Sequence, residues 1–380
     1  MNPNTRTNFA PKEKITTVRR ALLLFRNILT ESSTGLSAES SMRSLNSANG
    51  LISNLFNMGK KRSSLKLPNT VWFVAHPYAS PPRGDMVGNI CLWNRSSPHH
   101  RKLIESTQAT VVTSENQVLT QQEITFIGEW ECCSSFVPSG QNPPFNLIHT
   151  PIHSKHDAFI TKCVNTDPYV FGNEFKWISC KQPADRNRIH IGDFVIFGSY
   201  LLKNRKVDKI LIDTVLLVDK VISVEDFDPT QFSKCYNDVT IAHTRIHDKF
   251  YIVLGKMYDP TKSYEQNVPF SFVPCRRAED GLMDKLAVDC HLPIKELGGY
   301  PLCIGQSGGH LDIDDNIAAW RVVVDLVRSA GCELGVFMPE PTLPTSNSII
   351  DNEAKSIISK QNKNEKISTS CSGGTSGSHC

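Results

Sequence analysis

Short runs of apolar residues, separated by turns rich in Gly, Pro, Asn and Asp, dominate the middle of the chain. β-branched and aromatic residues are frequent in these runs, and most runs are of strand length. The pattern therefore predicts a strand-rich unit, with the last run folding as strand, turn and strand. The runs lie at 70–82, 86–93, 124–132, 157–164, 174–180, 193–198, 209–219 and 239–258.

One segment near the end has clear helical spacing. A glycine-rich loop at 305–315 leads into it, Asp314 or Asp315 is placed to cap it, and Gly331 follows its expected end. The spacing predicts a helix with one apolar face. The residues expected to be buried on that face are Ile317, Trp320, Val324 and Val327.

Interrupted strands with helices at the margins predict an α+β fold whose centre is a β-barrel or a strongly bent sheet. Residues 1–68 are expected to form a basic amphipathic helix and a flexible extension. Residues 69–345 form the α+β body, with a barrel-like unit at about 157–258. The tail at 346–380 is rich in Ser, Asn, Lys and Gly, which predicts disorder.

The formal net charge of +3 hides an uneven distribution. Residues 1–68 carry net +8, so the remainder carries net −5, and general attraction to nucleic acid is not implied. The chain lacks an apolar run long enough for a membrane span, and its first residues do not resemble a secretory signal. We expect a cytoplasmic protein without a membrane partner; the sequence leaves the oligomeric state open.

The twelve cysteines include no CxxC pair, so we expect reduced, mostly buried thiols and no metal or other cofactor. His149, His153 and His156 have metal-like spacing, but Pro151 prevents the helix that would bring the first two together. A metal site in a loop stays open for this histidine cluster.

The stretch from 165 to 219 combines aromatic residues, turn formers and strands. Its rings offer flat surfaces on which a base can stack, and its carboxylates suit the polar edge of a base. The alternative is that the rings are ordinary core residues. The predicted ligand-binding residues are Asp167, Tyr169, Phe171, Trp177 and Asp193.

Basic residues are concentrated in the same stretch. Residues 176–209 contain eight Lys and Arg against three acids, and such a patch suits phosphates. We expect Lys181, Arg186 and Arg188 to contact nucleic acid; a solvated polar turn is the alternative.

The order of these segments resembles the nucleotide-modification-associated families of phages and bacteria. The strand that begins with Gly-Asp is similar to one in the wider class of PUA-like barrels, which includes EVE, ASCH and YTH domains. The resemblance covers about 60 of the 380 residues and implies a role around modified bases, without an established reaction. It rests on DPYVFG at 167–172, CKQ at 180–182, GDFVIFGS at 192–199 and ILIDTVLLVDKVISVEDF at 210–227.

The best candidate for catalysis is the loop GQSGGHLDIDD at 305–315. Ser307 and His310 have the residue types of a nucleophile and its base, although turn formation and capping explain the same residues. The sequence thus leaves three hypotheses: a protein that binds nucleic acid or a modified nucleotide, an enzyme that acts on nucleotides or bases through this loop, and a structural protein that binds a partner.

Overall fold

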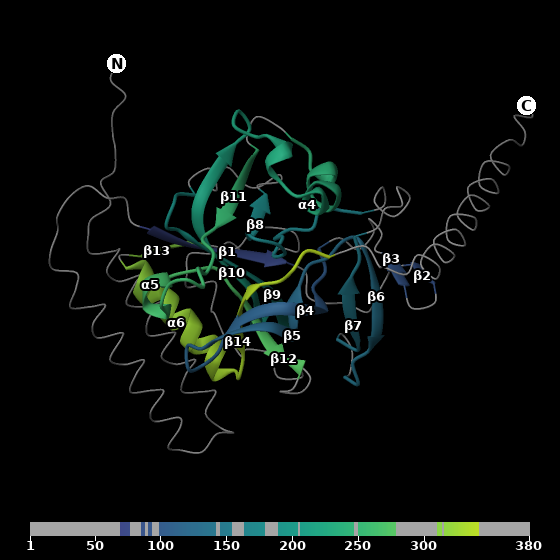
Figure 1. Ribbon diagram of the computed structural model, residues 1–380, viewed down its shortest axis with the longest axis horizontal. Coiled ribbons are helices and arrows are strands. Elements are labelled where there is room, and N and C mark those ends of the chain that lie inside the picture. Colours follow the sequence, from purple (N-terminus) through teal and green to yellow (C-terminus); the bar gives the residue numbers. More distant parts are fainter. Residues whose placement is uncertain are drawn as a thin grey trace, which may run out of the picture.

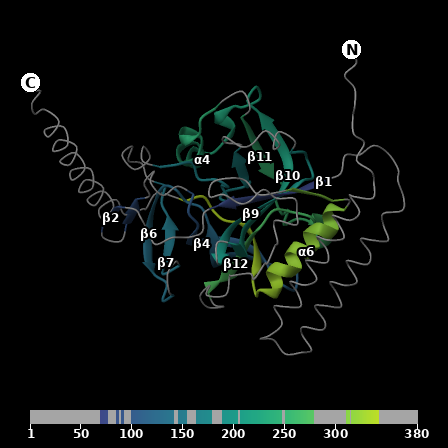
Figure 2. The ribbon, with the colours of Figure 1, turned by 180° about the vertical axis from the view of Figure 1, so that it is seen from behind.

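The computed structural model describes residues 69–76, 85–87, 90–92, 99–141, 145–153, 163–178, 189–203, 206–246, 250–278, 310–313 and 315–341. Within these ranges the chain forms two mixed β-sheets and a few helices (Figure 1). Helices α5 (Tyr264–Asn267) and α6 (Asn316–Ser329) lie at one end of the described part and β2 (Asp85–Val87) at the other in Figure 1, and the view from behind shows α6 and β2 at opposite ends as well (Figure 2).

The first sheet has six strands in the described part of the chain, in the order β13-β1-β9-β10-β11-β8. Strands β1 and β9 are parallel, and the other neighbours are antiparallel. The strands are β1 (Asn69–His76), β8 (Lys176–Ile178), β9 (Phe194–Lys203), β10 (Lys206–Ser223), β11 (Tyr251–Gly255) and β13 (His310–Ile313).

The second sheet has eight strands among the described residues, in the order β14-β12-β5-β4-β7-β6-β3-β2. Strands β4 and β7 are parallel, and β14 also pairs with β4, so this end of the sheet curls. The strands are β2 (Asp85–Val87), β3 (Ile90–Leu92), β4 (Lys102–Val112), β5 (Val118–Gly128), β6 (Cys133–Pro138), β7 (Leu147–Pro151), β12 (Val273–Arg277) and β14 (Glu333–Phe337).

The strand-rich α+β fold is confirmed in its general form, whereas the barrel alternative is wrong for the described residues. The six-stranded sheet ends at β13 and β8, which do not pair with each other, so the strands between 157 and 258 belong to an open sheet. They also need β1 and β13, from outside that span, to complete it. A PUA-like arrangement therefore stays a prediction.

Strand β10 is unusually long because it pairs with two different strands along its length. Its first part pairs with β9 and its last part with β11. The register with β9 shifts between Ile212 and Thr214, which leaves Asp213 as the extra residue of a β-bulge. Such bulges bend a strand and redirect a side chain, so the bulge decides where the Asp213 carboxylate points.

Helix α6 (Asn316–Ser329) begins and ends where the sequence predicts. Asp315 caps it by accepting hydrogen bonds from two backbone N–H groups of the first turn, and Gly331 after it has a φ of +75°. Trp320, Val324 and Val327 are buried as expected. The expectation for Ile317 is wrong: its side chain is 40% exposed, because it lies in the first turn at the margin of the buried face.

The start of the run 239–258, predicted as a strand, is helical instead: Val239 ends one helix, and the 3-10 helix η4 (Ile241–His243) follows. Helix α4 (Lys234–Val239) is capped by Ser233, whose Oγ accepts from the Tyr236 N–H, and it buries Cys235, Tyr236 and Val239. This packing outweighs the strand preference of the β-branched residues that follow. Among the described residues, the remaining helices are η3 (Pro229–Gln231) and α5 (Tyr264–Asn267).

Candidate functional site

The three aromatic residues predicted to stack on a base are core residues. Tyr169, Phe171 and Trp177 are each at most 1% exposed. Tyr169 meets Phe171 edge to face, with 5.6 Å between ring centroids, and Trp177 meets Phe197 in the same way at 5.6 Å. These rings pack within one hydrophobic cluster. Stacking on a base stays a prediction, and it requires these contacts to open.

Asp193 is buried and holds β1 against the turn that precedes β9. Its carboxylate accepts hydrogen bonds from the Thr70 N–H at 2.8 Å, the Trp72 indole at 3.1 Å and the His190 N–H at 2.9 Å. Gly192 enters this turn with a φ of +93°, a conformation that glycine adopts readily because it has no side chain, as expected of a glycine where a strand begins after a polar turn. These three hydrogen bonds explain by themselves why an aspartate is buried at position 193. The ligand contact of Asp193 stays a prediction.

Replacing Asp193 with alanine should lower the free energy of unfolding by about 2 kcal/mol, because the donors that it serves lose their acceptor in a buried place. Urea unfolding of the variant and the parent protein measures the difference. Asp193→Asn keeps one acceptor oxygen and should lose less. Equal stability of the alanine variant and the parent would contradict the role given to this carboxylate.

Asp167 connects the central stretch to a larger group of charged residues. Its Oδ1 accepts from the Ile178 N–H at 3.0 Å, and its own N–H donates to Glu129 Oε1 at 2.8 Å. Burial raises the pKa of the Asp167 carboxyl well above its usual value, although the hydrogen bond from Ile178 opposes the shift. Burial therefore favours the protonated form of this carboxyl group.

The other predicted site residues fall partly outside the described residues. Lys181, Arg186, Arg188 and Ser307 lie outside them, and for His310 only the backbone is described. His310 begins β13 and is paired with Trp72 of β1. Because β13 and β8 form opposite edges of the six-stranded sheet, strand pairing does not bring His310 and Trp177 together.

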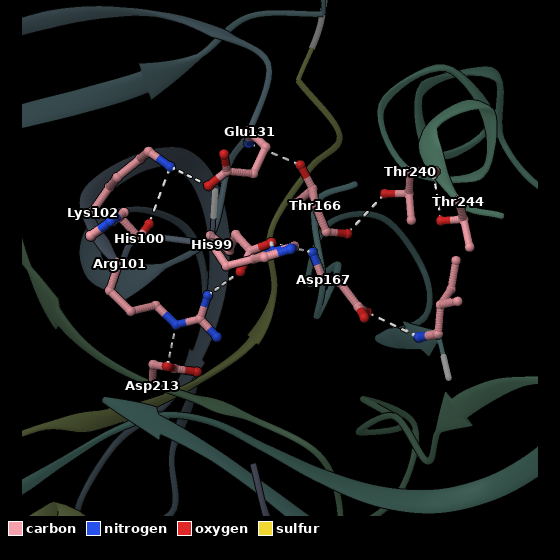
Figure 3. Close-up of polar contacts among 12 residues, drawn as sticks. His99, His100, Arg101, Lys102, Glu131, Thr166, Asp167, Asp213, Thr240 and Thr244 are labelled. Atoms are coloured by element: carbon pink, nitrogen blue, oxygen red, sulfur yellow. Dashed lines mark hydrogen bonds and ion pairs between the residues drawn. The ribbon is translucent and has the colours of Figure 1, made fainter. Parts of the chain in front are cut away.

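Seven charged residues, here called the buried charged cluster, meet between the two sheets (Figure 3). They come from the segment that enters β4, from the end of β5, from the bulge in β10 and from the turn before β8. This is the most extensive polar arrangement in the described part of the chain, and we take it as the candidate site. Its members are His99, Arg101, Lys102, Glu129, Glu131, Asp167 and Asp213.

Arg101 is the centre of the buried charged cluster. Its guanidinium binds Glu129 through Nη1, and its Nε donates to Asp213 Oδ2 at 2.5 Å. All three side chains have no exposed surface. Since Glu129 follows β5 and Asp213 belongs to β10, Arg101 joins the eight-stranded sheet to the six-stranded sheet.

Two further ion pairs extend from this centre. His99 Nδ1 lies 3.0 Å from Glu129 Oε1, and Lys102 Nζ lies 2.7 Å from Glu131 Oε1. In these ion pairs three cationic side chains thus face three carboxylates. A buried group of this size is stable only if its charges are paired in this way.

The pKa values of the carboxyl groups diverge with their surroundings. Burial raises the pKa of Glu129, but His99 and Arg101 outweigh it and the net shift is downward. For Glu131 and Asp213 burial prevails over Lys102 and Arg101 respectively, so their pKa values are raised.

His99 is the member of the buried charged cluster that reaches the surface. Its side chain is 29% exposed, whereas those of its partners in the ion pairs are at most 2% exposed. Burial lowers the pKa of His99, but attraction to and a hydrogen bond with Glu129, helped by Glu131 and Asp167, raise it to about 9. At neutral pH, His99 therefore presents a positive charge to solvent.

Some hydrogen-bonding capacity of the cluster is unused within the described part of the chain. Arg101 Nη2, Asp213 Oδ1 and Glu131 Oε2 are buried without a hydrogen-bond partner there. Arg101 and Asp213 are already bonded to each other, so the spare donor and acceptor belong to the same ion pair. The cluster can therefore accept further polar contacts without losing those it has.

The sequence analysis missed the buried charged cluster. The available signals were the sequence HHRK at 99–102, which enters a strand, and the acids that flank Trp130 at the end of another strand. Charged residues at strand ends are usually solvated, so neither segment indicates burial by itself. Only the contact between distant strands reveals it.

The histidine cluster is divided between separate partners. His149 is buried with its Nδ1 3.0 Å from Ser134 Oγ, and burial lowers its pKa to about 3. His153 Nε2 lies 2.8 Å from Asp238 Oδ2, and His156 lies outside the described residues. Within the ranges given above, no group of three or more metal-binding side chains is placed to hold a metal ion.

Comparison with known proteins gives no relative to which this chain can be assigned: no protein-family model, curated protein or solved structure matches it. Among the described residues, the helices are all too short or too polar to cross a membrane. The function must therefore be inferred from the fold and from the buried charged cluster.

Proposed function

We propose that this protein binds nucleic acid or a modified nucleotide, as part of a nucleotide-modification or defence system, and that His99 contacts a phosphate of the ligand. The observation that carries the proposal is the partly exposed imidazole that buried Glu129 keeps protonated at neutral pH. A positioned cation at the surface attracts phosphate oxygens, and a charged donor gives them a strong hydrogen bond.

The connection between His99 and the central stretch supports the same location. One carboxylate oxygen, Glu129 Oε1, contacts both His99 Nδ1 and the backbone N–H of Asp167. Asp167 in turn binds the N–H of Ile178, the last residue of β8. Ile178 lies near the start of the basic stretch at 176–209, three positions before Lys181, so this part of the chain is linked to His99 by three contacts. The residues proposed to meet phosphates with His99 are Lys181, Arg186 and Arg188.

Replacing His99 with glutamine should weaken binding of a fluorescent single-stranded oligonucleotide about five- to tenfold near 0.1 M salt. This is the loss of affinity expected when one charged contact to a phosphate is removed. Glutamine can still hydrogen-bond to Glu129 but carries no charge. The slope of log K against log salt concentration should fall by about one. Fluorescence anisotropy across a salt series measures both quantities, and unlabelled mononucleotides and duplexes added as competitors identify the preferred ligand.

The matched control is Lys262→Gln, which removes one positive charge from an exposed residue beside α5. It should leave affinity and salt slope unchanged. If the parent protein binds no nucleic acid or nucleotide, the proposed function is wrong. If neutralising Lys181, Arg186 and Arg188 weakens binding and His99→Gln does not, nucleic-acid binding stands and His99 has no part in it.

A further inference from the structure

Cysteines gather beside the buried charged cluster. Every described cysteine is a buried thiol outside any disulfide bond, and three of them lie where the chain from the end of β5 to the start of β6 runs next to the segment before β8. The thiol of Cys132 is hydrogen-bonded to those of both Cys133 and Cys163. A thiol that contacts two others goes beyond the reduced, buried cysteines that the sequence predicts.

Hydrogen bonds hold the two segments together next to these thiols. The Glu131 N–H donates to Thr166 Oγ1 at 3.0 Å, and the Asp167 N–H donates to Glu129 Oε1. Thr166 is fixed from its other side, because its N–H donates to the carbonyl of Val239 and its carbonyl accepts from the Thr240 hydroxyl. Figure 3 shows Thr166 between Glu131 and Thr240. The approach of Cys132 to Cys163 is therefore a built feature of the fold.

Geometry selects Cys163 as the partner of Cys132. Consecutive Cα atoms are about 3.8 Å apart, which is shorter than the roughly 4.4 Å that an ordinary disulfide spans, so the neighbours Cys132 and Cys133 are poorly placed to pair. Cys133 Sγ also contacts the carbonyl oxygen of Ile152 at 3.6 Å. Cys235, a fourth thiol nearby, is hydrogen-bonded to Tyr169 instead.

We propose that Cys132 and Cys163 are an oxidisable thiol pair that forms a disulfide on reaction with a small disulfide such as oxidised glutathione. The thiolate of one cysteine attacks one sulfur of the small disulfide; the S–S bond breaks, a mixed disulfide forms and one small thiol is released. The thiolate of the second cysteine then displaces the other small thiol. The protein thiols lose two electrons and two protons, and the small disulfide is reduced to two thiols.

The electrostatics favour Cys132 as the attacking thiol. Hydrogen bonds from Cys133 and then Cys163 lower the pKa of Cys132 well below its usual value, although burial opposes this. The hydrogen bond to Cys132, together with burial, raises the pKa of Cys163. Because both thiols are at most 2% exposed, the oxidant enters through local opening, and the reaction is slower than at a surface thiol.

The disulfide would lock the site residues in place. It joins the segment that carries Glu129 and Glu131 to the segment that carries Asp167, and it closes a loop of roughly 30 residues, which stabilises the folded state. Oxidation should therefore raise the midpoint of thermal unfolding by about 5 °C or more. Any change in nucleotide affinity on oxidation rests on the proposed function, whereas the disulfide itself does not.

The test is a peptide map of the full-length protein after prolonged exposure to oxidised glutathione and digestion without reductant. A cross-linked pair of peptides containing Cys132 and Cys163 is the expected result. Cys163→Ser and Cys163→Ala should abolish it, while Cys275→Ser, at a buried cysteine of β12, should keep it. Because the map of the parent protein is decisive, a variant that fails to fold does not affect the conclusion.

Absence of this cross-link in the folded parent protein would overturn the proposal, as would predominant pairing of Cys132 with any other cysteine. The outcome is independent of ligand binding: the cross-link can form in a protein that binds no nucleotide, and nucleotide binding can occur without it. A comparison of oligonucleotide affinity before and after oxidation then shows whether the thiol pair regulates the proposed site.

Discussion

Replacing Arg101 with methionine is expected to lower the free energy of unfolding by about 3 to 5 kcal/mol, the cost of breaking a buried ion pair from one side. Methionine fills much of the same space, so the loss comes from charge. Glu129 and Asp213 would stay between the two sheets without their shared cation. Domains are typically stable by only about 5 to 15 kcal/mol, so this change removes a large part of the total.

Urea unfolding followed by circular dichroism measures the effect of Arg101→Met. The double variant Arg101→Met, Asp213→Asn also removes the charge of Asp213, one of the two carboxylates left without Arg101. Part of the lost free energy of unfolding should therefore be recovered. Arg321→Met is the matched control: Arg321 pairs with Glu265 on the surface, and its loss should change stability by about 0.5 kcal/mol or less. If Arg101→Met costs no more than Arg321→Met, the buried charged cluster does not hold the two sheets together.

The second large effect is a loss of stability between pH 6.5 and about pH 9 that depends on His99. The folded state raises the pKa of His99 from 6.5 to about 9, because the ion pair and hydrogen bond with Glu129, with help from Glu131 and Asp167, outweigh the opposing effect of burial. A raised pKa means that the folded state binds the proton more tightly than the unfolded state. The contribution is therefore complete below pH 6.5 and disappears as the pH rises through about 9.

The full shift corresponds to about 3 kcal/mol, and the partial exposure of the imidazole reduces the expected effect to about 2 kcal/mol. Stability should be measured across this pH range for the parent protein and for His99→Gln, since the difference removes the contribution of other titrating groups. The two curves should converge at the alkaline end. Parallel curves would show that His99 has the same pKa in the folded and unfolded states.

Local features of the fold could be predicted from the sequence because they depend on neighbouring residues. Asp315 caps α6 through bonds to the next turn, and Gly192 adopts a positive φ that side chains disfavour. The segment that starts at Val239 shows the limit of such reasoning. Its β-branched residues favour a strand, but Val239 is buried in the core as the last residue of α4, and η4 (Ile241–His243) follows.

The candidate site could be predicted only in fragments. The sequence predicts Asp167 as a ligand-binding residue from its place in an aromatic turn, and in the structure it belongs to the buried charged cluster through its contact with Glu129. Tyr169 and Trp177 were recognised from the same stretch, yet both are core residues in the structure. An aromatic side chain in a strand gives the same sequence signal whether its face is covered by protein or open to a ligand.

By itself, the sequence determined a strand-rich α+β chain, the end points of its clearest helix, the turn at Gly192 and the absence of paired-cysteine motifs. Only the tertiary structure decided that Arg101 faces Asp213, a residue 112 positions away that a β-bulge redirects, and that Cys132 meets Cys163. The physical reason is that the burial of a charge or a thiol depends on partners from other strands. The pairing of those strands is set by the whole core and not by the residues beside them.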